Sequence, residues 1–124
     1  MIPAALFAIL ATIRLGAIHA VVFGGFAPLS LGQRIEASEA RVILTASCGV
    51  EGAKGAINYQ SFVRGAIESS KWKPQKVLIW QREQSPWTEL SPQTGERDWQ
   101  ELVKAAKQNG DKAESVPVNS NDGL

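Results

Sequence analysis

The sequence is poor in side chains that cross-link a chain or hold a metal. Its 124 residues include one cysteine, Cys48, and one histidine, His19. One cysteine excludes a disulfide framework, and one of each excludes a cluster of transition-metal ligands, so we predict no metal site. A lone cysteine without an Asn-x-Ser/Thr acceptor is typical of a reducing, intracellular setting.

The net charge is also small, at +1, and the 13 basic residues form no cluster in the sequence. A nucleic-acid interface needs a basic face, so no nucleic-acid partner is predicted. The sequence is 44% hydrophobic and 20% charged, which excludes disorder over the whole chain. Only Arg14 is charged among the first 33 residues. This asymmetry predicts a buried first part joined to a surface part.

The first 30 residues are apolar enough to raise the question of a membrane segment. A spanning helix needs about 20 predominantly apolar residues. Arg14 interrupts the run, and glycines and Pro28 break helix continuity. A buried helix followed by a buried strand fits better, so we predict no membrane partner. A membrane anchor through residues 1–30 is the competing hypothesis.

Hydrophobic periodicity predicts helices alternating with strands. The chain length fits one domain, and this alternation is typical of an α/β fold with a parallel sheet. The first helix is apolar all round, which predicts burial. Asn58 and Asp98 are predicted helix caps. We expect helices over residues 4–15, 29–40, 58–70 and 99–108, strands over 17–23, 41–46 and 76–81, and a polar loop over 82–97.

Ligands of parallel sheets bind beyond the carboxyl ends of the strands, where two glycine-rich loops are expected. Gly24 and Gly25 form either a tight turn or a close approach to an anion. Residues 47–56 place a glycine at every third position around Lys54, which fits either a phosphate-binding nest or a solvated surface loop. Buried core roles are favoured for Cys48 and His19.

Three stretches resemble the acetyl-/propionyl-CoA synthetases, a family of adenylate-forming ligases. Residues 14–26 read R-x-G-A-I-H-x-V-V-F-G-G-F, residues 42–49 read VILTASCG, and residues 76–82 read KVLIWQR. The form T-A-S-x-G-x-E with Tyr59 downstream is similar to the propionate branch. The resemblance implies that residues 1–124 are a part of an AMP-dependent synthetase/ligase domain, within its three-layer parallel-sheet subdomain and before its phosphate loop.

The resemblance also implies the activity. The family adenylates a short-chain carboxylate such as propionate or acetate with ATP and Mg²⁺, releases pyrophosphate, and transfers the acyl group to coenzyme A. The family's phosphate loop, carboxylate pocket and adenine site have no counterpart in these residues. We therefore expect no catalytic residue here, no activity of the chain alone, and a need for the rest of the parent polypeptide. The expected location is cytoplasmic or in the mitochondrial matrix.

The site that the resemblance implies is a coenzyme A contact. Glu51, Gly52, Ala53 and Lys54 would lie near the phosphorylated nucleotide end of coenzyme A, with Lys54 where the family commonly has arginine. Gly24 and Gly25 would lie near the path of the pantetheine arm. A coenzyme A- or nucleotide-binding module without catalysis is the alternative to a ligase segment.

Overall fold

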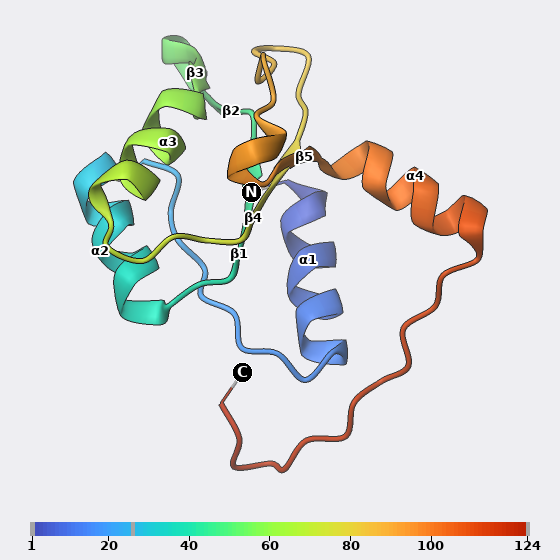
Figure 1. Cartoon of the computed structure of the whole chain (residues 1–124). Helices are drawn as coiled ribbons and strands as arrows, with labels where there is room; N and C mark the ends of the chain where they lie inside the picture. Colours follow the sequence, from blue (N-terminus) through green and yellow to red (C-terminus); the bar gives the residue numbers. More distant parts are fainter. Residues whose placement is uncertain (1, 26, 124) are drawn as a thin grey trace.

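The computed structural model describes residues 2–25 and 27–123 (Figure 1). Phe26, which belongs to the first matching motif, lies outside the described residues. The described part has α1 (Pro3–Arg14), α2 (Pro28–Ser38), β1 (Val42–Ala46), β2 (Cys48–Glu51), η1 (Gly52–Lys54), β3 (Gly55–Asn58), α3 (Gln60–Ser69), β4 (Lys76–Trp80), η2 (Pro92–Thr94), β5 (Glu96–Asp98) and α4 (Trp99–Asn109).

A three-stranded parallel sheet lies at the centre, in the order β1-β4-β5. Ile43 pairs with Val77 on one side of β4, and Ile79 pairs with Asp98 on the other. Helix α3 connects β1 to β4, as parallel neighbours require a crossover. The predicted α/β class with a parallel sheet is confirmed.

Helices lie on both sides of this sheet (Figure 1). Helices α2 and α3 pack against each other on one side, with α1 and α4 on the other, which gives three layers. The contact between α2 and α3 is close at Gly32, where an added Cβ would lie 2.9 Å from the Ala66 carbonyl oxygen. Small residues at this crossing let Ile35 reach the interior, where it is buried.

The core gathers around β4 and reaches into the segment that follows it. Val63, Val77, Ile79 and Trp87 form one buried cluster. Trp87 comes from the stretch predicted as a polar loop, and so does β5. That prediction was wrong about β5, because hydrophobic periodicity does not identify a three-residue strand whose sequence is Glu-Arg-Asp.

A buried carboxylate holds this segment in place. Glu96 is 3% exposed. Its carboxylate accepts two hydrogen bonds of 2.8 Å from the Arg64 guanidinium, one from the Ser91 N–H and one from Trp87 Nε1. Arg64 also lies over the Trp87 ring, 5.7 Å from its centroid. These contacts satisfy a charge that would be costly to bury alone.

The apolar first part differs from its prediction. Residues 17–23 form no strand, and the Ile18 side chain is 75% exposed. Helix α1 forms as expected with Pro3 in its first turn, but Leu6, Phe7 and Leu10 are more than half exposed. A strand and an all-apolar helix both need partners, and the described residues supply few. No helix within residues 2–25 and 27–123 is long and apolar enough to cross a bilayer.

Candidate functional site

The predicted glycine-rich loop is a two-stranded hairpin, so its prediction as a loop was wrong. Strands β2 and β3 pair antiparallel, with Cys48 opposite Asn58 at the base and Glu51 opposite Gly55 at the tip. Gly52 and Gly55 have φ angles of +40° and +72°, a region that other residues rarely adopt. Glycine at these two positions therefore allows the chain to turn between the strands.

The hairpin tip carries the four residues predicted to contact coenzyme A. Gly52, Ala53 and Lys54 form the short turn η1, and all three are exposed. Lys54 Nζ lies 3.8 Å from a Glu51 carboxylate oxygen, and its side chain is 78% exposed. An exposed pair of this kind is weak, so the ammonium group is available to an anion approaching from solvent.

The hairpin base is fixed to the carboxyl edge of the parallel sheet. Ser47 and Cys48 are fully buried. Ser47 donates its N–H to the Trp80 carbonyl at 2.9 Å, and its Oγ accepts the Arg82 N–H at 2.9 Å. Arg82 also donates from Nη1 to the Cys48 carbonyl at 3.1 Å. The hairpin thus projects from the edge where parallel sheets bind ligands.

The Gly24–Gly25 turn lies beside the base of the hairpin. A Cβ added at Gly24 would collide with the Tyr59 hydroxyl, and so would one added at Gly49 in β2. Tyr59 therefore brings the two predicted glycine loops together at the base, while the tip with Lys54 projects beyond. Whether these residues contact coenzyme A stays a prediction.

Tyr59 and Arg82 are the residues that sequence reasoning missed at this site. Burial raises the pKa of the Tyr59 phenol above 10.0, the Glu51 carboxylate and the Cys48 sulfur raise it further, and Arg82 opposes them. The phenol is therefore neutral at physiological pH. Arg82 had a detectable signal, since it follows the predicted strand 76–81 directly at its carboxyl end.

The side chains of Cys48 and His19 form no catalytic pair among the described residues. Cys48 is a free, fully buried thiol, and the buried Nδ1 of His19 has no hydrogen-bond partner among the described residues. Within residues 2–25 and 27–123, no three His, Cys, Asp or Glu side chains lie close enough to hold a metal ion.

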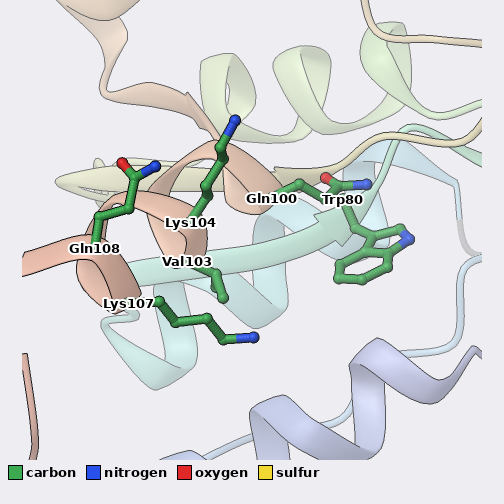
Figure 2. Close-up of a pocket in the computed structure, with 6 residues that line it drawn as sticks. All are labelled: Trp80, Gln100, Val103, Lys104, Lys107 and Gln108. Atoms are coloured by element: carbon green, nitrogen blue, oxygen red, sulfur yellow. The ribbon is translucent and has the colours of Figure 1, made fainter. Parts of the chain in front are cut away.

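A separate cavity of about 340 Å³ lies along α4. It is lined by Trp80 and by residues of α4: Gln100, Val103, Lys104, Lys107 and Gln108 (Figure 2). The Lys107 side chain extends in the direction of Trp80, and the Lys104 side chain points away from Trp80. None of the predicted site residues lines this cavity, so it is distinct from the hairpin.

Fold and site together define an α/β unit whose parallel sheet carries a glycine-bounded hairpin at its carboxyl edge. No protein-family model matches the sequence. Over all 124 residues it is 44% identical to an uncharacterized protein of Pseudomonas aeruginosa, of which it spans 19%. Over 120 residues, 97% of this chain, it is 38% identical to the Bos taurus protein named acyl-CoA synthetase short-chain family member 3, mitochondrial, of which it spans 17%.

A third relative matches a shorter stretch. Over 54 residues, 44% of this chain, the sequence is 54% identical to the acetyl-coenzyme A synthetase of Beijerinckia indica, of which it spans 8%. The predicted resemblance to the short-chain acyl-CoA synthetases is confirmed, since named members of that family match most of the chain. It spans less than a fifth of the length of the curated relatives it matches.

Proposed function

We propose that this chain is the coenzyme A-contacting segment of an ATP-dependent short-chain acyl-CoA ligase. The complete reaction joins a short carboxylate to coenzyme A, with ATP and Mg²⁺ used for an acyl-adenylate step and with AMP and pyrophosphate released. The observation that carries the proposal is 38% identity over 97% of the chain to a short-chain acyl-CoA synthetase. Of the two expected locations, cytoplasm and mitochondrial matrix, the name of the Bos taurus relative supports the mitochondrial one.

Propionate is the proposed carboxylate ahead of acetate. The support is the T-A-S-x-G-x-E form of residues 45–51 with Tyr59 downstream, which resembles the propionate branch. The carboxylate would bind elsewhere in the complete ligase. We therefore assign to these 124 residues a binding role without the adenylation chemistry, and we expect no release of pyrophosphate from the purified chain.

The proposed contact is electrostatic and lies at the hairpin tip. Lys54 presents an ammonium group to solvent at the end of β2–η1–β3, beyond the sheet edge where ligands bind. Gly52 and Ala53 add no bulky side chain, so a phosphate can reach the backbone. Glu51 reduces the net charge of the tip, which favours a single phosphate contact over a strongly basic cradle.

Equilibrium dialysis of the chain with coenzyme A and with its analogue lacking the 3′-phosphate tests this assignment. We expect tighter binding of coenzyme A. Lys54→Ala should remove most of that preference, roughly a several-fold change for an exposed charge-assisted contact, and Lys54→Arg should keep it.

Lys71 offers the matched control. It forms a similar exposed pair, 3.9 Å from Glu36, with its side chain 90% exposed, and it lies away from the hairpin after α3. Lys71→Ala should leave both affinities unchanged. Equal binding of the two ligands by the unaltered chain, or equal losses from Lys54→Ala and Lys71→Ala, would refute the contact.

A further inference from the structure

The Tyr59 side chain occupies the space between two glycines from different parts of the chain. A Cβ added at Gly24 would lie 2.9 Å from the ring carbon Cζ and 3.2 Å from Cε2 of Tyr59. A Cβ added at Gly49 would lie 2.7 Å from Cζ and 3.3 Å from Cε1. In both cases the Tyr59 hydroxyl oxygen is nearer still, so the tip of the phenol lies between Gly24 and Gly49.

Backbone conformation does not explain glycine at these two positions. Neither Gly24 nor Gly49 is among the glycines with positive φ, in contrast to Gly52 and Gly55. An alanine at either position would avoid a positive φ, but its Cβ would collide with the hydroxyl and ring of Tyr59. Both glycines are therefore explained by the packing of Tyr59, without a ligand in the gap.

The position of the Tyr59 ring is set by the elements on both sides of it. Its N–H donates to the Ser47 carbonyl at 2.9 Å, which ties it to the hairpin base, and its carbonyl accepts the Val63 N–H at 2.9 Å in the first turn of α3. The side chain also packs against the buried core cluster. A residue held in this way can fix the distance between two surface segments.

We propose that Tyr59 is a positioning residue that holds the Gly24–Gly25 turn against the base of the β2–β3 hairpin. The two segments assigned to coenzyme A, the turn and the hairpin tip, then form one surface with a fixed spacing. This inference rests on the proposed function and adds to it the residue that organises the site. Tyr59 acts through the glycines and does not touch the ligand.

A double-mutant cycle on the chain itself tests the packing. Cys48 is the only cysteine, adjoins Gly49 and is fully buried, so its rate of reaction with a thiol reagent reports on opening of the hairpin base. Gly49→Ala should raise that rate by about tenfold or more, because the added methyl group displaces the ring. In a Tyr59→Ala background the same substitution should change the rate by less than about twofold.

Gly65→Ala is the matched control, since its added Cβ would lie 3.7 Å from Pro28, an ordinary contact. It should leave the thiol rate unchanged. Equal acceleration by Gly49→Ala in both backgrounds, or no acceleration in either, would overturn the proposal.

The affinity for coenzyme A separates positioning from general stability. Tyr59→Phe removes the hydroxyl but keeps the ring carbons between the glycines, so it should bind coenzyme A within about twofold of the unaltered chain. Tyr59→Ala should bind several-fold more weakly. Phe62→Ala, which removes another half-buried ring from α3, should have no such effect. If Lys54→Ala weakens binding and Tyr59→Ala does not, the proposed function stands and the positioning role is wrong. If neither weakens it, the coenzyme A assignment fails and this role with it.

Discussion

At the residue scale, the buried Glu96 carboxylate accepts four hydrogen bonds, two of them from Arg64. Removing one partner of a buried pair leaves an uncompensated charge. We expect Arg64→Ala to lower the free energy of unfolding by about 3 kcal/mol, at the low end for such pairs because the Arg64 side chain is 40% exposed. Urea denaturation measures this, with Arg97→Ala as the control. A loss no larger than that of the control would contradict the role given to the pair.

The same carboxylate predicts an acid dependence of stability. Burial alone would raise the pKa of Glu96, but the hydrogen bonds from Arg64, Ser91 and Trp87 outweigh it and hold the pKa below 4.5. A pKa lowered by folding contributes stability above the unfolded value, and this is lost as pH falls through the folded value. Unfolding free energy should therefore drop on acidification below about pH 4.5, and less steeply in Glu96→Gln.

Candidate site residues could be predicted where they belong to one contiguous motif, and not where their role depends on distant parts of the chain. Glu51, Gly52, Ala53 and Lys54 were selected as candidates because their motif is contiguous in the sequence, and their contact with coenzyme A stays a prediction. The role of Tyr59 depends on a long-range contact, in which its side chain lies between Gly24 and Gly49. No local pattern records that contact.

At the element scale, the predicted N-terminal cap of α4 was confirmed. Asp98 accepts a hydrogen bond of 3.0 Å from the Glu101 N–H at the start of the helix, and Gly110 takes the left-handed conformation at its end. Asp98→Ala should lower the free energy of unfolding by about 1 kcal/mol. Chemical denaturation monitored by tryptophan fluorescence would measure it. Asp111→Ala, beyond the helix end, should leave the free energy of unfolding unchanged. Equal losses from Asp98→Ala and Asp111→Ala would contradict the capping role of Asp98.

Elements that depend on long-range partners were predicted less well. The strands over residues 41–46 and 76–81 were confirmed within one residue because they pair with each other. The prediction of a strand over residues 17–23 was wrong, because no neighbouring strand in the described part of the chain forms backbone hydrogen bonds with this segment. Strand β5 was missed because its burial depends on Arg64 and Trp87, which no periodicity detects.

At the scale of the whole molecule, the chain exposes a large apolar surface. Leu6, Phe7 and Leu10 of α1 and Val21 and Phe23 beyond it are all more than half exposed. Contiguous apolar patches above a few hundred Å² promote association. Sedimentation velocity should show self-association that rises with concentration, reduced by a Phe7→Glu, Leu10→Glu double variant. A monodisperse monomer at every concentration would contradict this.

The central claim is that this segment acts on coenzyme A and not on ATP. The most direct test places these 124 residues in the full-length Bos taurus relative, which is named an acyl-CoA synthetase, and measures the two half-reactions separately. Lys54→Ala should raise the KM for coenzyme A from several-fold to about a hundredfold, with a smaller effect at high salt. Adenylation, measured as ATP–pyrophosphate exchange, should be unchanged. Loss of exchange with an unchanged KM for coenzyme A would contradict the account.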